Sequence, residues 1–203
     1  MTAPPPPPGP VRTYLTVDSP YEVANWRPLV HWVLYIPHAI VLYVLQLAAE
    51  VLFVLYWLIV IVTGKPNRGL YGVLALYERY NARATGFLLG YTERYAPFDF
   101  DMGTTDNGVY PPVRLDLPEP PAEVSRVKAL NLFLAIPHYI VFMVFGIGAF
   151  FALIVAWFAV LFTGRWPDGL RAFVIRVANY YYRIWTYVVM VDNEYPRFGL
   201  PAA

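Results

Sequence analysis

The chain of 203 residues contains no cysteine and few charged side chains. The absence of cysteine excludes disulfides, thiolate chemistry and cysteine-ligated zinc or iron–sulfur centres, so a metal would need histidine or carboxylate ligands. Charged residues make up 14% of the chain, against about a quarter in an average soluble domain. The formal net charge is only +1. An ordinary nucleic-acid-binding domain has an excess of basic residues, which this chain lacks. Nucleic acid is therefore not an expected partner.

Hydrophobic residues make up 58% of the chain, and the mean hydropathy of +0.45 is far above that of a typical soluble domain. This composition favours a membrane protein. Residues 1–11 begin with Met-Thr-Ala and a proline run, and they lack the basic and apolar regions of a secretory signal. We predict a disordered, proline-rich tail there, because repeated proline favours an extended backbone without internal hydrogen bonds. Residues 199–203 form a second short tail.

Two apolar segments, Leu29–Val62 and Ala129–Phe162, are near copies offset by 100 residues. The matching positions are Pro37, His38, Trp57, Thr63, Gly64, Gly69, Leu70, Arg83, Tyr95 and Phe98, which align with Pro137, His138, Trp157, Thr163, Gly164, Gly169, Leu170, Arg183, Tyr195 and Phe198. Such self-similarity predicts two tandem units, residues 12–98 and 122–198. Residues 99–121 are rich in Asp, Gly and Pro, which predicts an aqueous linker with turns.

Each apolar block is too long for one simple crossing of a bilayer. A straight helix of 34 residues would be about 51 Å long, against a hydrocarbon core of about 30 Å. We therefore predict a helical hairpin at residues 29–62 and another at 129–162, with tips near Gln46–Glu50 and Gly146–Gly148. A re-entrant pair and one long bent helix stay open as alternatives for each block. All 15 Lys and Arg residues lie outside these blocks. The positive-inside rule then predicts a multi-pass plasma-membrane protein with both termini in the cytoplasm.

Each hairpin is followed by a segment with helical periodicity, residues 69–93 and 169–191. Apolar and aromatic residues share one face, while Glu78, Arg79 and Arg83, or Arg171 and its neighbours, share the other. We predict amphipathic interfacial helices whose arginines face anionic phosphates. Short strands are possible before each repeat, near residues 12–20 and 113–117. The predicted fold class is an all-α membrane protein.

The Thr-Gly-basic sequence after each block has two compatible interpretations. Glycine can adopt the left-handed conformation that ends a helix, and a basic residue suits the negative helix terminus. Beside a membrane, the same cations could neutralise a lipid phosphate. The candidate headgroup-binding residues are Lys65, Arg68, Arg165 and Arg171.

His38 and His138 follow the repeated prolines within the apolar blocks. Proline frees the carbonyl four residues earlier, and the histidines could be polar groups that help to satisfy it. Alternatively, the two imidazoles could bind haem or a metal, or relay protons. Glu50 is the one acid in the blocks. It is expected at the outer interface if it lies at a hairpin tip, and it is a proton-relay candidate if it is buried.

The other polar groups give little support for catalysis. Asp99, Asp101 and Asp106 in the linker could suggest calcium, but their spacing does not match an EF-hand loop, and a solvated acidic turn is favoured. Serines stand in linkers without a paired histidine, and no carboxylate pair is spaced for acid–base work. The chain is therefore not expected to be an enzyme.

At Ile36-Pro37-His38, at Trp157–Leu170 and at the closing residues 192–198, the chain resembles a bacterial, often actinobacterial, membrane family. This family is known only as domain-of-unknown-function family 4389. The resemblance covers most of residues 26–198 and implies a multi-pass membrane protein with no established activity or catalytic residues. The first repeat departs from the second at residues 65–68, and at Tyr95-Ala96 in place of Tyr195-Pro196. If the family has a functional site at these residues, we expect this chain to have it in the second repeat.

We expect a non-enzymatic accessory or scaffold protein that binds anionic lipids, partner membrane proteins or a second copy of itself. Two alternatives stay open. A small transporter or channel component would use His38, His138, Gln46 and Glu50 as its polar lining. A haem-binding redox subunit would use His38 and His138 as ligands. No cofactor is predicted apart from this haem alternative.

Overall fold

A computed structural model describes residues 14–192 and 194–201. The predicted tail at residues 1–11 lies outside this range, as do residues 202–203 of the second tail. The elements in chain order are β1 (Leu15–Val17), α1 (Arg27–Thr63), α2 (Arg68–Leu88), β2 (Val113–Leu115), the 3₁₀-helix η1 (Arg126–Leu130), α3 (Asn131–Leu134), α4 (Ile136–Thr163) and α5 (Asp168–Val188). The fold is mostly helical, as predicted.

The predicted membrane hairpins are wrong. The first apolar block is one continuous helix, α1, that runs through the supposed tip at Gln46–Glu50. In the second block α4 continues through Gly146–Gly148, and the helical path is interrupted only near its start, at Ala135. The physical reason is that neither tip stops a helix: the first has no Gly or Pro, and each glycine of the second costs only about 1 kcal/mol. Length alone did not require a turn.

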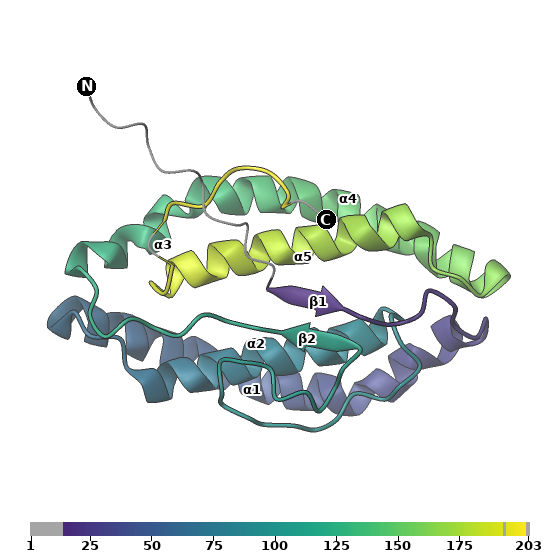
Figure 1. The fold of residues 1–203 in the computed structure, drawn as a ribbon, viewed down its shortest axis with the longest axis horizontal. Helices are drawn as coiled ribbons and strands as arrows, with labels where there is room; N and C mark the ends of the chain where they lie inside the picture. The colour runs from purple at the N-terminus through teal and green to yellow at the C-terminus, as the bar shows by residue number, and fades with distance from the viewer. Residues whose placement is uncertain (1–13, 193, 202–203) are drawn as a thin grey trace.

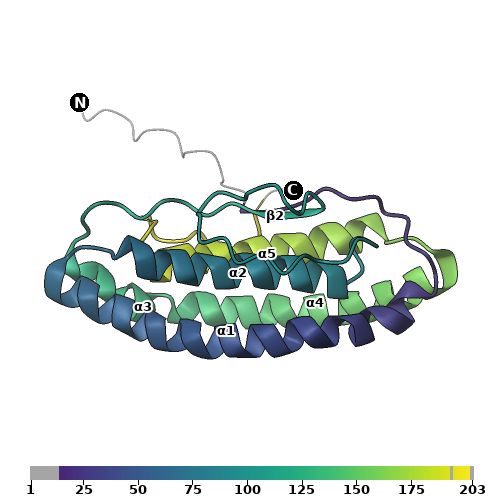
Figure 2. The same cartoon turned by 90° about the horizontal axis from the view of Figure 1, so that it is seen from below.

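The true hairpins are formed by each long helix and the helix that follows it, α1 with α2 and α4 with α5 (Figure 1). The helices α2 and α5 confirm the predicted amphipathic helices, although they end earlier, at Leu88 and Val188. Seen from the side, the elements form layers: α1 and α4 lie on one face, α2 and α5 lie above them, and the strands and connectors cover the other face (Figure 2). Every layer runs along the same long axis.

The two units are related by an approximate twofold axis, because α1 and α4 run in opposite directions (Figure 1). The indole N–H of Trp157 donates to the Pro28 carbonyl at 3.1 Å, and that of Trp57 donates to the Ala129 carbonyl at 3.0 Å. The end of each long helix therefore contacts the start of the other.

The segment that precedes each unit also crosses to the other unit. The Val23 N–H donates to the carbonyl of Gly164, which ends α4, and the Val124 N–H donates to the carbonyl of Gly64, which ends α1, both at 2.8 Å. Both glycines are left-handed, with φ of 70° at Gly64 and 67° at Gly164. This confirms the helix-terminating role predicted for the Thr-Gly-basic turns.

The short strands predicted before each repeat are confirmed. β1 and β2 pair antiparallel, with Leu15 opposite Leu115. The Asn179 side chain of α5 accepts from the Tyr14 and Leu15 amides at 2.8 and 2.9 Å. These bonds attach the small sheet to the amphipathic layer.

Candidate functional site

The outer face of α1 and α4 is covered by exposed hydrophobic side chains. The largest include Trp32, Ile40, Tyr43, Val51, Val54 and Leu58 on α1, and Ile140, Met143, Ile147, Phe150, Phe151 and Phe158 on α4. Both helical segments are long and apolar enough to cross a bilayer, and only 17% of the most apolar window of each is buried. The core helix of a soluble protein would be mostly buried. An exposed apolar area of this extent is characteristic of an interaction surface.

The polar face of α2 is covered by the linker. Arg79 and Arg83 are buried, and Arg83 pairs with Asp99 and, at 2.9 Å, with Asp106. Arg79 pairs with Asp101 at 3.4 Å. The prediction that these arginines face lipid phosphates is wrong, because the linker folds back along α2. The aspartates hold buried arginines rather than forming a solvated turn, and the described residues contain no group of three or more possible metal ligands.

Burial and charge shift the pKa values in this cluster. Burial, and then the neighbouring charge of Arg83, lower the pKa of Arg79. Burial alone would raise the pKa of Asp99, but hydrogen bonds from Asn107 and Arg83 together hold it below its usual value. The cluster is therefore an ion-paired structural network.

Arg171 does not remain a headgroup candidate, because its residue is only 1% exposed. Its guanidinium donates to the carbonyls of Ser19 and Pro20 at 3.0 and 2.9 Å, and it lies 4.3 Å from the ring centroid of Tyr21. The physical reason is that the segment before α1 crosses the polar face of α5. Burial lowers the pKa of Arg171.

The other three headgroup candidates, Lys65, Arg68 and Arg165, are exposed. They lie at opposite ends of the molecule, because the α1–α2 and α4–α5 connections do (Figure 1). Lys65 pairs with Glu123 at 3.3 Å, and Arg165 pairs with Glu22 at 3.5 Å. Exposed ion pairs of this kind contribute at most about 1 kcal/mol. These cations therefore stay accessible to an anionic surface.

The Pro-His sequences form two matched buried sites. Nδ1 of His38 lies 2.7 Å from the Tyr80 hydroxyl, and Nδ1 of His138 lies 2.8 Å from the Tyr180 hydroxyl. Each imidazole also stacks on a phenylalanine from the end of its own unit, Phe98 or Phe198. The tyrosine partners were missed from sequence, although they too repeat at an offset of 100.

The two histidine sites are separate. The contacts of Trp57 and Trp157 place α1 and α4 in an antiparallel register in which positions 38 and 138 are displaced by about nine residues, or about 14 Å along the axis. The structure therefore does not bring His38 and His138 together around one haem or metal. The hydroxyls of Tyr95 and Tyr195 donate to the carbonyls of Leu34 and Leu134, three residues before each proline, and not to the carbonyls four residues before, which proline frees.

Glu50 lies in the middle of α1 rather than at a hairpin tip, because there is no tip. It is exposed and accepts a hydrogen bond from Gln46 at 2.9 Å. His38 and His138 are fully buried in their own sites. The structure does not join these polar groups into one path.

Glu78 on α2 is a buried acid that sequence reasoning placed on the polar face. It is 2% exposed, and the Tyr181 hydroxyl of α5 donates to Oε1 at 2.8 Å. Burial raises the pKa of Glu78 to about 7, although the tyrosine opposes this. The bond joins the two units, but the second unit has Ala178 at the matching position. A comparison of the two repeats at this position would have distinguished Glu78 from the sequence alone.

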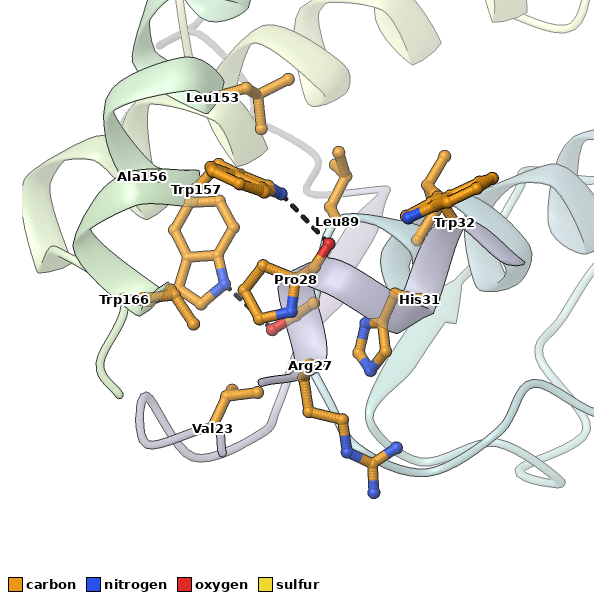
Figure 3. Close-up of a pocket in the computed structure, with 13 residues that line it drawn as sticks. Val23, Arg27, Pro28, His31, Trp32, Leu89, Leu153, Ala156, Trp157 and Trp166 are labelled. Atoms are coloured by element: carbon orange, nitrogen blue, oxygen red, sulfur yellow. Dashed lines mark hydrogen bonds between the residues drawn. The ribbon is translucent and has the colours of Figure 1, made fainter. Parts of the chain in front are cut away.

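A pocket of about 240 Å³ lies between the start of α1 and the end of α4 (Figure 3). It is lined by Val23, Arg27, Pro28, His31, Trp32, Leu88, Leu89, Gly90, Leu153, Ala156, Trp157, Val160 and Trp166. Arg27 and His31 lie at one end of the group and Leu153 at the other (Figure 3). Sequence reasoning did not predict this pocket.

A family profile described as a domain of unknown function (DUF4389) matches residues 25–101 and again 129–199. The two matches fall on the two structural units. No curated protein and no solved structure matches the chain. Because the family profile covers well over half of the sequence, the chain belongs to the family described as a domain of unknown function (DUF4389).

Proposed function

We propose that the protein is a non-enzymatic membrane accessory protein that embeds its α1–α4 face in one leaflet and carries a polar platform above it. The observation that supports this most directly is the layering: the apolar layer and the polar layer extend along the same axis (Figure 2). An element with one apolar face and one polar face is stable in the plane of a membrane interface.

A crossing orientation disagrees with this geometry. The 37 residues of α1 give a helix about 55 Å long, nearly twice the hydrocarbon thickness of about 30 Å. Because α2 packs along α1, turning α1 across the bilayer would carry Arg79, Arg83 and Asp106 towards the hydrocarbon. A charged side chain costs about 2.5–3.5 kcal/mol at the centre of a membrane helix. The in-plane orientation replaces the multi-pass arrangement predicted from sequence.

Side chains at the edges of the apolar layer fit a membrane interface. Trp26 and Trp32 are exposed near the start of α1, and aromatic rings of this kind are favoured at headgroup depth. The exposed cations Lys65, Arg68 and Arg165 lie at the two ends. Each such cation near an anionic surface contributes about 1 kcal/mol. We propose anionic lipids as the binding partner of these ends.

The side of the membrane follows from the same charges. The positive-inside rule favours a cytoplasmic polar layer, and the family resemblance favours a bacterial plasma membrane. Partner proteins would then contact the connectors and the small sheet on the cytoplasmic side. The strands and connectors lie on the side of α2 and α5 that faces away from α1 and α4 (Figure 2), and this side would be the scaffold surface.

Single cysteines test the orientation, since the natural chain has none. Asn25→Cys and Lys65→Cys flank α1, while Ala48→Cys lies on its exposed face. Vesicles of both orientations are treated with a membrane-impermeant maleimide. The proposal expects residues 25 and 65 to react from the same, cytoplasmic side and residue 48 to react from neither. Reaction of residues 25 and 65 from opposite sides would establish a crossing helix and overturn the proposal.

A further inference from the structure

The pocket at the start of α1 contains buried polar atoms without partners. Nε of Arg27 and both ring nitrogens of His31 are inaccessible and reach no hydrogen-bond partner among the described residues. The His31 ring stacks on Phe87 at 4.4 Å. The Phe87 carbonyl interacts with the imidazole, but it lies outside hydrogen-bond geometry for either nitrogen. Buried polar groups are nearly always paired in native proteins, and here the unpaired atoms belong to two side chains that line a cavity.

The rest of the pocket is apolar and opens towards the α1–α4 face. Trp32 is 60% exposed and Trp157 is 39% exposed, and both line the pocket together with Leu153. A volume of about 240 Å³ is slightly below the range of roughly 300–1,000 Å³ for drug-sized ligands. It therefore suits part of a flexible chain better than a bulky ring system. An amphiphile has an apolar chain and a polar headgroup. It therefore fits a cavity that has an apolar lining and polar side chains without partners.

At the opposite end of the molecule, the position that matches the pocket is filled. Tyr56 stands where the pocket has Ala156, and its hydroxyl donates to the Val189 carbonyl at 2.8 Å. Asn131 stands where the pocket has His31, and its amide donates to the Tyr187 carbonyl at 2.9 Å. At that end the space is filled and the polar group is paired. The chain can therefore close this position, but at the pocket it has a small residue and unpaired donors.

We propose that this pocket binds the acyl chain and anionic oxygen headgroup of a membrane amphiphile. The chain lies among Trp32, Leu153 and Trp157. On binding, the His31 ring and the Arg27 guanidinium turn towards the pocket that they line, where a carboxylate or phosphate oxygen accepts hydrogen bonds from them. Glu93, which pairs with Arg27 at 3.4 Å, leaves Nε of that guanidinium free for the ligand. This inference rests on the proposed membrane embedding, because a pocket on an embedded face is supplied by the bilayer.

The test uses a variant that copies the closed end. Ala156→Tyr should fill the pocket as Tyr56 fills its own end, and Ala48→Tyr adds the same side chain to the exposed face of α1 as a control. The purified full chain in detergent is titrated with 9,10-dibromostearate, whose bromines quench nearby tryptophans. We expect saturable quenching in the natural chain and in Ala48→Tyr, and at least a tenfold weaker apparent affinity in Ala156→Tyr.

Two further arms identify the headgroup and guard against misfolding. Brominated phosphatidylglycerol and brominated phosphatidylcholine replace the fatty acid, so that a free carboxylate, an anionic phosphate and a zwitterionic head are compared. Saturable quenching by either anionic probe supports the proposal and identifies the source. His31→Asn, which copies Asn131, should weaken binding of the anionic probes several-fold and change the phosphatidylcholine signal little.

Equal quenching in the natural chain and Ala156→Tyr, or no saturable quenching by any probe, overturns the pocket proposal. Co-flotation of each protein with vesicles is measured in parallel. If all variants float and the pocket signal is absent, membrane embedding stands and the pocket inference fails. If the natural chain does not float, the embedding itself fails, whatever the quenching shows.

Discussion

The two ends of this molecule are built from the same duplicated unit, but one is closed and the other contains a pocket. At the closed end Tyr56 is fully buried and bonds across to Val189. At the open end Ala156 occupies the matching position, and about 240 Å³ stays unfilled. The difference teaches that a matched position can hold a core side chain in one repeat and line a pocket in the other.

A second difference lies in how the two long helices begin. Pro28 and Ala129 accept the matching indole bonds at an offset of 101, whereas Leu34 and Leu134 accept the matching tyrosine bonds at an offset of 100. The second unit therefore has one residue fewer in this stretch. Its start is the 3₁₀-helix η1, which rises about 2.0 Å per residue instead of 1.5 Å. The tighter helix spans the same distance with the shorter chain.

Tyr56→Ala is expected to have the largest effect on this comparison. It removes a buried ring and a hydrogen bond at the closed end, which should lower the free energy of unfolding by about 4 kcal/mol, as for other buried aromatic truncations. It should also create a second pocket, in which bound dibromostearate quenches the fluorescence of nearby tryptophans. Denaturant unfolding in detergent measures the first effect. A loss below about 1 kcal/mol would mean that the closed end is not packed as described.

Arg83→Ala should have the next largest effect. Asp99 and Asp106 would lose their buried cation, and breaking such a pair costs about 3 kcal/mol. The matched control is Arg183→Ala, because Arg183 is half-buried and, within the described part of the chain, donates to the carbonyls of Arg197 and Gly199 and pairs with no carboxylate. Its loss should cost about 1 kcal/mol. Equal losses in the two variants would show that the linker does not cover α2 as described.

Glu78 should make stability depend on pH, whereas Ala178 at the matching position of the second unit cannot. Its pKa is about 7 in the folded protein, above the ordinary value near 4.5, so the folded state binds the proton more tightly. The stabilisation is complete below pH 4.5, decreases by about 3 kcal/mol as the pH rises to about 7, and is constant above it. Glu78→Gln should remove this part of the slope. Thermal unfolding of both proteins at pH 5 and pH 8 gives the difference, and parallel profiles would contradict the assignment.

The smallest expected effects lie where the repeats agree. Tyr80→Phe and Tyr180→Phe each remove one hydroxyl from a matched histidine site. Each should cost about 1 kcal/mol, and the two losses should be equal within error. Unfolding midpoints of the two variants provide the measurement. A twofold or larger difference between them would break the equivalence of the sites.

Much of the fold was predictable, because the repeat, the Gly64 and Gly164 helix ends and the amphipathic helices are local patterns. The hairpins were predicted wrongly, since hydropathy reports that a helix prefers lipid but not whether it crosses the bilayer or lies within it. The burial of Arg83 and Arg171 could not be predicted either. It depends on the linker and the first segment folding back over the helices, and amphipathic periodicity does not distinguish a covered polar face from a solvated one.

Part of the pocket could be predicted from the sequence. Aligning the repeats places Ala156 against Tyr56 and His31 against Asn131, and a change from a large to a small residue at a matched core position is a visible signal. Its meaning required the structure, because only the antiparallel register brings the end of α4 to the start of α1. Without that register, Arg27 and Trp157 are 130 positions apart in sequence and show no relation.

The exchanged lead-in segments, with Val23 held by Gly164 and Val124 held by Gly64, mean that neither unit is complete by itself. The glycine that ends the long helix of each unit accepts a hydrogen bond from the other unit, so the units exchange contacts as the subunits of a symmetric dimer do. The covalent connection between the halves keeps them at a high local concentration, in addition to the linker's own contacts with α2. Two separately produced halves should assemble into the same shape, and a chain with the order of its units reversed should do so as well.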